Sequence, residues 1–175
     1  MREHVALFYS KHSPLSNHYP APFQLNGTLY NCSEQYIMQQ KCLHFGDHEL
    51  ADKIMNVTDP VEQKNLGKNI KNFDKKSWIK NAKRLIFDGI KQKVIQNLVV
   101  SNLLLHTDSR KIAEANPNDA VFGIGASLND EKAWDIKAWS NTKNVMGKIL
   151  EKIRSELKFG AVGHDHDSST SSNDN

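Results

Sequence analysis

The 175-residue chain has little of what marks membrane, secreted or disulfide-bonded proteins. Its apolar runs, such as residues 98–100 and 103–105, are far shorter than the roughly 20 residues that a membrane-spanning helix needs. The N-terminal stretch is too polar, and its apolar part too short, for a secretory signal. Cys32 and Cys42 form no CxxC pair, so we expect reduced thiols. We therefore expect a soluble intracellular protein with no membrane partner, located in the cytoplasm, with the nucleus as an alternative.

Several catalytic signatures are also missing. The sequence has no GxxxxGK[ST] phosphate loop, no GxGxxG fingerprint, no HExxH motif and no GxSxG nucleophile elbow. No spacing of histidines and cysteines specifies zinc either. These absences argue against the enzyme classes that those motifs mark, so any function must rest on less conspicuous residues.

Positive charge is present but unevenly distributed. The formal net charge of the chain is +3, yet the segment Lys71–Lys93 alone holds eight lysines and arginines against two aspartates. A local surplus of this kind favours phosphate-bearing partners, and contact of Lys71–Lys93 with a nucleic-acid backbone is one interpretation. A solvated helix face explains the same charge equally well.

Composition and hydrophobic patterning indicate a single α+β domain, mainly α-helical, over residues 1–159. The first thirty residues favour short strands, because Asn26-Gly27 suits a type I′ turn between residues 23–25 and 28–30. This small N-terminal β element is the predicted β part of the domain. The polar tail, residues 160–175, has almost nothing to bury and is predicted to be disordered.

Helical character begins near Ser33 and returns at intervals along the chain. Asp47 and either Thr58 or Asp59 suit N-caps, and Pro60 suits a first helical turn. The stretch 111–139 loses all periodicity and is predicted to be rich in loops. Helices are predicted at residues 33–44, 47–56, 60–69, 74–97, 98–105 and 142–158.

Residues 33–41 carry the most informative chemistry. In a helix, Glu34 and Lys41 lie within about 20° of each other around the axis and about 10 Å apart along it. Ile37 and Met38 lie between them on the same face. An acid and an amine so placed are too far apart for surface pairing, but both can reach a ligand that lies across that face. The alternative makes Glu34 part of a capping box with the asparagine three residues before it, and leaves Lys41 extended along the surface.

Three other places allow both a structural and a functional interpretation. Trp78 suits either a core anchor or a stacking platform. The turn at 116–119 leads into Gly123-Ile-Gly125, where a bare backbone lets a ligand approach, although a plain connection is equally consistent. Residues 139–147 open the last helix, whose first amides suit a phosphate.

A series of short segments, each present once, follows a characteristic order along the chain. They are Leu15-Ser16-Asn17-His18-Tyr19-Pro20, Ser33-Glu34-Gln35-Tyr36 through Gln40-Lys41, Leu66-Gly67-Lys68, Trp78, Arg84, Leu103-Leu104-Leu105, Asn116-Pro117-x-Asp119, Phe122-Gly123-Ile124-Gly125 and Asn144-x-x-Gly147. In this order the chain resembles the NADAR family of ADP-ribose-processing glycosidases over about residues 8–157. Three positions depart from the family pattern: His18 replaces an aromatic residue, Lys68 an arginine and Phe122 a tryptophan. We expect these positions to touch substrate or to shape the pocket.

The resemblance implies a NADAR-like fold and hydrolysis of a bond between ribose C1 and a nitrogen, with no metal and no cofactor. For most members of this pattern, the implied substrate is ADP-ribose attached to the amino group of guanine in nucleic acid. A related branch cleaves phosphorylated pyrimidine intermediates of riboflavin synthesis. The resemblance places the catalytic residues at Glu34, Lys41 and Asp119, and the substrate-binding residues at Asn17, Ser33, Trp78, Phe122, Gly123, Gly125, Asn144 and Gly147.

These side chains suit the implied chemistry. Breaking the bond builds positive charge on the sugar, which a buried Glu34 carboxylate can stabilise. Lys41 serves either as a Schiff-base amine, if desolvation lowers its pKa, or as a phosphate or hydroxyl contact. Asp119 would orient a water or a ribose hydroxyl, and the rings of Trp78 and Phe122 would stack on a base. Gly123, Gly125 and the helix start at Asn144 would accommodate a pyrophosphate.

Three functional hypotheses follow. The first is an ADP-ribosyl-guanine hydrolase, the second an N-glycosidase for riboflavin intermediates, and the third a non-catalytic module that binds ADP-ribose or NAD. Retention of Glu34, Lys41 and Asp119 argues against the third. The basic segment Lys71–Lys93 favours the first over the second.

Overall fold

The computed structural model describes residues 1–162 of the chain. The last helix, α6 (Val145–Val162), continues through residues 160–162. The rest of the predicted disordered tail, residues 163–175, lies outside the described residues. Among residues 1–162, no helix is long and apolar enough to cross a membrane.

The N-terminal strands form as the sequence predicts. Strand β2 (Phe23–Leu25) pairs antiparallel with β3 (Thr28–Tyr30). Asn26 and Gly27 join them, and both have positive φ angles, 51° and 80°. A type I′ turn requires positive φ at both central positions, which asparagine and glycine tolerate best. Strand β1 (Val5–Phe8) does not join this hairpin.

All six predicted helices are present, with ends that shift by a few residues. The predicted N-caps are confirmed: the Asp47 side chain accepts a hydrogen bond from the backbone N–H of Leu50, and Asp59 accepts one from Val61 N–H. Pro60 occupies the first turn of its helix. The first five helices are α1 (Ser33–His44), α2 (His48–Met55), α3 (Pro60–Leu66), α4 (Lys75–Gln96) and α5 (Leu98–His106).

The predicted loop at 111–139 is partly wrong. Its first residues form β4 (Lys111–Glu114), which pairs parallel with β1 so that Phe8 lies opposite Glu114. Two short 3₁₀ helices, Glu131–Trp134 and Ile136–Trp139, lie further along. A four-residue strand whose central residues are buried shows no alternation of polar and apolar residues, so the sequence pattern could not reveal it.

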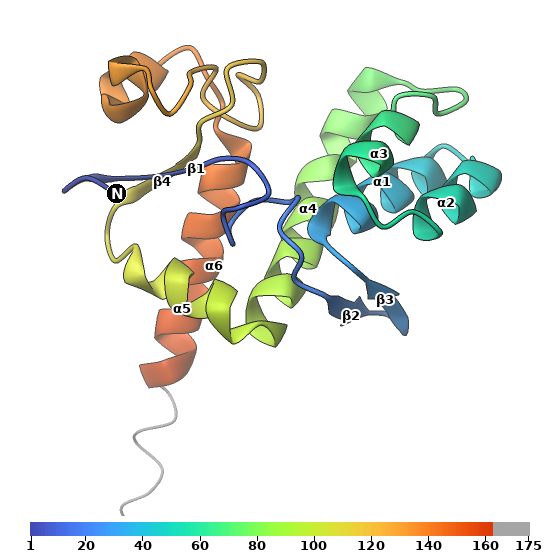
Figure 1. Ribbon diagram of the computed structural model, residues 1–175, viewed down its shortest axis with the longest axis horizontal. Helices are drawn as coiled ribbons and strands as arrows, with labels where there is room; N and C mark the ends of the chain where they lie inside the picture. The colour runs from blue at the N-terminus through green and yellow to red at the C-terminus, as the bar shows by residue number, and fades with distance from the viewer. Residues whose placement is uncertain (163–175) are drawn as a thin grey trace, which may run out of the picture.

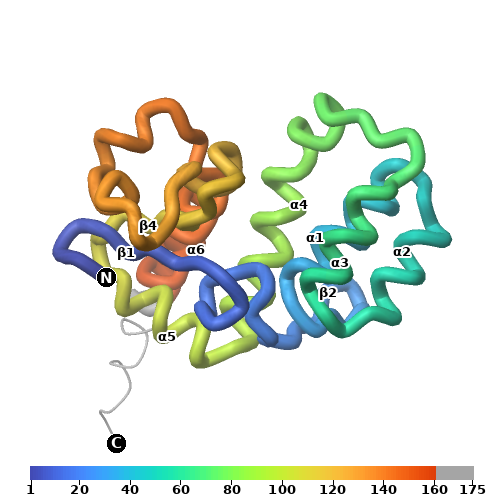
Figure 2. Tube along the Cα trace, turned by 45° about the horizontal axis from the view of Figure 1, so that its top comes forward, coloured from blue at the N-terminus to red at the C-terminus, as the bar shows by residue number. Residues whose placement is uncertain are grey.

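The long helix α4 lies between two groups of elements (Figure 1). On one side α1 packs against α2, α3 and α4, and on the other α6 packs against β4, α5 and α4. The tube in Figure 2 shows the same division, with β1, β4 and α6 across from α1–α3. Ile86 and Ile90 of α4 belong to the largest apolar cluster, together with Leu104 of α5 and Ile153 of α6.

The first turn of α6 packs closely against β4. The side chain of Asn144, which has a φ of 42°, donates from Nδ2 to the carbonyl of Ile112 at 2.8 Å. A Cβ atom at Gly147 would overlap that same carbonyl oxygen. Gly147 therefore allows the helix to approach the strand, and both residues serve this contact rather than the predicted ligand contact.

We expect Gly147→Ala to lower the free energy of unfolding by about 1–3 kcal/mol, because the new methyl group must push α6 away from β4. Gly160→Ala is the matched control on the same helix. Nothing lies within 4 Å of a Cβ at Gly160, so this variant should be neutral or gain up to about 1 kcal/mol from helix propensity. Urea unfolding measures both values. Equal stabilities of the two variants would contradict the packing role of Gly147.

Candidate active site

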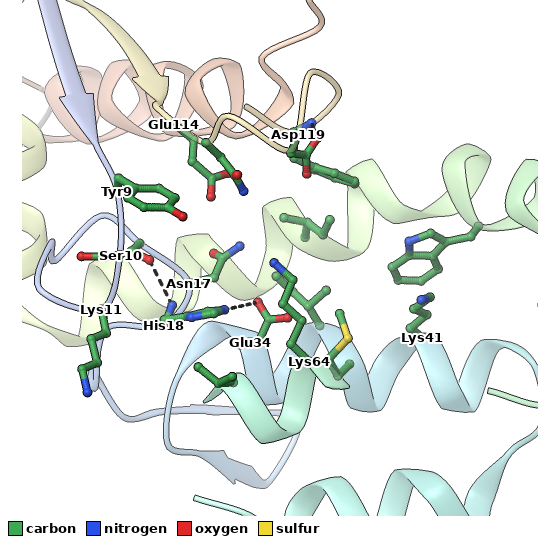
Figure 3. Close-up of a pocket in the computed structure, with 18 residues that line it drawn as sticks. Tyr9, Ser10, Lys11, Asn17, His18, Glu34, Lys41, Lys64, Glu114 and Asp119 are labelled. Atoms are coloured by element: carbon green, nitrogen blue, oxygen red, sulfur yellow. Dashed lines mark hydrogen bonds and ion pairs between the residues drawn. The ribbon is translucent and has the colours of Figure 1, made fainter. Parts of the chain in front are cut away.

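A cavity of about 490 Å³ lies between the loop that follows β1, the helices α1, α3 and α4, and the loop that follows β4. Its volume is within the range of about 300–1,000 Å³ that is typical of small-molecule sites. Of the predicted site residues, six line it: Asn17, Glu34, Lys41, Trp78, Asp119 and Phe122. Figure 3 shows side chains from both walls reaching into the space.

The α1 wall has the predicted arrangement. Glu34, Ile37, Met38 and Lys41 all line the cavity, as one face of a helix should. The capping alternative for Glu34 is wrong, because the N-cap of α1 is Cys32 and makes no side-chain capping hydrogen bond. Glu34 is 5% exposed, and its Oε2 lies 3.5 Å from Nε2 of His18.

The loop that carries Asn17 and His18 is held from two sides. The carbonyl of Asn17 accepts a hydrogen bond from Glu34 N–H at 3.0 Å. The carbonyl of Ser16 accepts one from Nζ of Lys93 at 2.6 Å. Lys93 is 1% exposed, and this burial lowers the pKa of its amine to about 7. The α4 helix therefore positions His18 beside Glu34 through a buried lysine.

Lys41 lies at the other end of the α1 wall from Glu34 (Figure 3). Its Nζ donates to the carbonyl of Gly67 at 3.0 Å and lies 4.4 Å from the centre of the Phe73 ring. Burial lowers the pKa of the Lys41 amine. Trp78 is 7% exposed and packs in the main core, yet it also lines the cavity. The core interpretation of this tryptophan is therefore confirmed, and its role as a stacking platform stays a prediction.

Asp119 and Phe122 come from the turn after β4. Oδ1 of Asp119 accepts hydrogen bonds from the N–H groups of Val121 and Phe122, both at 2.8 Å. A Cβ at Gly123 would lie 2.6 Å from the carbonyl oxygen of Glu114, and Gly125 has a φ of 65°. These two glycines let the turn fold onto the end of β4, and neither is among the residues that line the cavity in the described chain.

The predicted phosphate site at the start of α6 is wrong. The N–H groups of Val145 and Met146 donate to the carbonyls of Val121 and Phe122, at 3.1 and 3.0 Å. Amides engaged in this way have no hydrogen left for a phosphate. Asn144, Gly147 and the fully buried Ser33 also lie outside the lining formed by residues 1–162.

Sequence reasoning did not propose several residues that do line the cavity. These include Glu114 at the end of β4 and two lysines, Lys11 and Lys64. Burial, with a smaller contribution from the nearby Asp119 carboxylate, raises the pKa of the Glu114 carboxyl to about 7. Recognising β4 would have placed Glu114 at a strand end beside the Asp119 turn, but so short a strand gives no signal. His18, noted as a departure from the family pattern, does line the cavity.

The basic segment Lys71–Lys93 is not one continuous surface. Lys93 is buried, Nζ of Lys91 lies 2.8 Å from Glu156, and Nζ of Lys71 lies 3.6 Å from Glu49. The remaining basic residues are exposed at the first half of α4. Of these, Lys76, Lys80 and Lys83 share one face by their spacing, and we call these three the α4 basic face.

Comparison with known proteins connects this site to a family. Residues 7–158 match the family described as NADAR domain. The chain belongs to the NADAR family. Among its relatives, N-glycosidase R617 of Acanthamoeba polyphaga mimivirus is 35% identical over 146 residues, which cover 81% of this chain and 85% of the relative. Protein irg-1 of Caenorhabditis elegans is 31% identical over 167 residues, which cover 86% and 78%.

The bacterial N-glycosidase YbiA is a more distant NADAR relative. The Escherichia coli protein is 25% identical over 160 residues, covering 90% of this chain and 91% of YbiA. Its NMR structure superposes with a TM-score of 0.75 at 24% identity, covering 96% of this chain and 93% of that one. The α+β, mainly helical NADAR fold is therefore confirmed. By its family this NADAR protein is an N-glycosidase, a hydrolase of N-glycosidic bonds.

The buried Lys93 generates a stability prediction. Its folded-state pKa of about 7 is below the ordinary value of 10.5, so between these pH values the unfolded chain binds a proton that the folded chain does not. Stability should therefore rise with pH across that window. From pH 7 to pH 9, the wild type should gain about 2 kcal/mol of unfolding free energy relative to Lys93→Met.

Urea unfolding of both proteins at the two pH values tests this expectation. Lys80→Met removes an exposed lysine from the same helix and should keep the wild-type pH dependence. If Lys93→Met and the wild type respond equally to pH, the amine of Lys93 is not desolvated in the folded protein.

Proposed function

We propose that this NADAR protein removes ADP-ribose from guanine bases of nucleic acid. The supporting observation is that one cavity contains the carboxylates of Glu34 and Asp119, the rings of Trp78 and Phe122, and lysine amines. A ligand that joins a sugar, a base and a charged diphosphate has a matching group for each of these features. Phosphorylated pyrimidine intermediates of riboflavin synthesis are the alternative substrates.

In this proposal the Glu34 carboxylate lies beside C1 of the ribose and stabilises the positive charge that develops as the bond breaks. His18, 3.5 Å away, holds the orientation of that carboxylate. Asp119 directs a water or a ribose hydroxyl from the opposite wall. The lowered pKa of Lys41 increases the fraction of its amine that is neutral. Nucleophilic attack on the sugar requires this neutral form.

The phosphates are assigned to lysines and not to the start of α6. Lys11 and Lys64 are exposed and line the cavity, so each can contact an anion that enters from solvent. The α4 basic face extends the positive charge along the helix that supplies Trp78. This face is assigned to the nucleic-acid backbone on either side of the modified base.

The test is to incubate the protein with an ADP-ribosylated guanine oligonucleotide and, separately, with phosphorylated pyrimidine intermediates of riboflavin synthesis. Mass spectrometry then identifies the products. Release of ADP-ribose with restored guanine supports the proposal. Cleavage of the pyrimidine intermediates alone would assign the protein to the alternative branch.

Glu34→Gln should lower kcat by about 10²–10⁴, because the amide cannot offer the negative charge that the transition state needs. Affinity for ADP-ribose should stay within several-fold, since the side chain keeps its shape. Steady-state kinetics and calorimetric titration with ADP-ribose measure the two quantities. Glu62→Gln on α3, an exposed residue, is the control and should leave both unchanged. Full activity in Glu34→Gln would remove Glu34 from the mechanism.

Charge reversal on the α4 basic face tests the nucleic-acid assignment. The double variant Lys80→Glu, Lys83→Glu should raise KM for the modified oligonucleotide and weaken its dependence on salt, because fewer counterions are released on binding. Hydrolysis of the corresponding ADP-ribosylated mononucleotide should change little. The same reversal at exposed Lys132 and Lys137 controls for net charge. An equal loss on both substrates would count against contact with the backbone.

A further inference from the structure

The cavity contains two glutamates whose surroundings differ. Glu34 comes from α1 and faces the imidazole of His18. Glu114 comes from the end of β4 and projects into the cavity from the other wall, on the same side as Asp119 (Figure 3). One glutamate therefore has a nitrogen partner, whereas the other has a carboxylate neighbour.

The fold holds Glu114 in this position from both sides. It is the last residue of β4, opposite Phe8 of β1, and its backbone carbonyl accepts a hydrogen bond from Ile124 N–H at 3.0 Å. The close approach at Gly123 brings the turn of Asp119 against the same carbonyl. Within residues 1–162, its carboxyl group has neither a hydrogen bond nor an ion pair, so its oxygens remain available to a ligand.

The charged groups around Glu114 come from every wall of the cavity. Burial is the main reason that its pKa rises to about 7, and the carboxylates of Asp119 and Glu34 act in the same direction. Lys64 of α3 opposes the shift less than Asp119 supports it, and His18 opposes it least. A carboxyl group with this pKa still holds its proton in about half of the molecules at pH 7.

We propose that Glu114 is a catalytic residue, the acid that protonates the departing nitrogen. When the bond between ribose C1 and nitrogen breaks, its electron pair stays on the nitrogen and the Glu114 proton transfers there. The oxygen of water ends on C1, whether water adds directly or releases the sugar from Lys41, and the proton that water gives up restores the Glu114 carboxyl. The leaving base departs neutral, and the enzyme returns to its starting state.

Two carboxyl groups on opposite walls divide the work in a way known for other glycosidases. Glu34, beside an imidazole, supplies negative charge to the sugar, while Glu114 supplies the proton to the base. This inference rests on N-glycosidase activity and not on the identity of the base, since any nitrogen that leaves an anomeric carbon benefits from protonation.

The test compares Glu114→Gln with the wild type across pH 5–9, on whichever of the two substrate classes the wild type cleaves. The wild-type kcat/KM should fall about tenfold per pH unit above about pH 7, as the acid loses its proton. Glu114→Gln should lose about 10²–10⁴ in kcat and lack that decline. Glu151→Gln is the control: this glutamate binds the N–H of Ile112 in the same strand, outside the cavity, and the variant should keep the wild-type profile.

Thermal unfolding gives a second measurement that needs no substrate. Because the pKa of Glu114 is raised from 4.5 to about 7 in the folded protein, the protonated carboxyl group favours folding. The stability that this proton contributes is lost as pH rises from about 4.5 to about 7. Glu114→Gln should therefore melt above the wild type at pH 8 and close to it at pH 5. The same melting difference at both pH values would overturn the proposal.

A kcat within several-fold of the wild type, or an unchanged alkaline decline in Glu114→Gln, would also overturn it. These failures are distinct from failure of the substrate proposal. Cleavage of pyrimidine intermediates alone would refute guanine as the base, and the Glu114 comparison would proceed on those intermediates. Full activity of Glu114→Gln on the guanine substrate would refute the role of Glu114 as the acid and would leave the proposed substrate standing.

Discussion

The site depends on a buried amine, that of Lys93. Its Nζ donates a hydrogen bond to the carbonyl of Ser16 at a distance of 2.6 Å. Burying a lysine costs free energy unless its charge or hydrogen-bonding capacity is satisfied. Here the hydrogen bond ties the central helix α4 to the loop of Asn17 and His18. That loop in turn accepts the N–H of Glu34 and places an imidazole beside its carboxylate. This contact thus helps to position the loop that faces Glu34.

The opposite wall depends on the packing of α6 against β4. Asn144 and Gly147 bring the helix onto the carbonyl of Ile112, and the turn of Asp119 closes over the end of the strand. Glu114 and Asp119 therefore project into the cavity from a rigid support, although their stretch of sequence looked like a loop. A site between two firmly held walls can keep carboxyl groups at fixed positions without the flexibility that exposed loops have.

Local features of the fold were predictable because short-range physics decides them. The Asn26-Gly27 turn and the caps at Asp47 and Asp59 each depend on a few neighbouring residues. The shared face of Glu34 and Lys41 follows from helical geometry alone. Strand β4 has no such local signal, because only its pairing with β1, more than a hundred residues earlier, makes it a strand.

The sequence by itself determined the family, the mainly helical α+β class and the helix face that carries Glu34 and Lys41. Tertiary structure decided what each of the polar and glycine positions singled out in the sequence does. The glycines near 123–125 and at 147 serve close packing, and the amides of Val145 and Met146 at the start of α6 are already bonded. Lys93 of the basic segment is buried in the core, and Glu114, which the sequence did not single out, lines the cavity. The reason is that burial and hydrogen-bond partners come from residues distant in sequence, and these contacts decide which groups can meet a ligand.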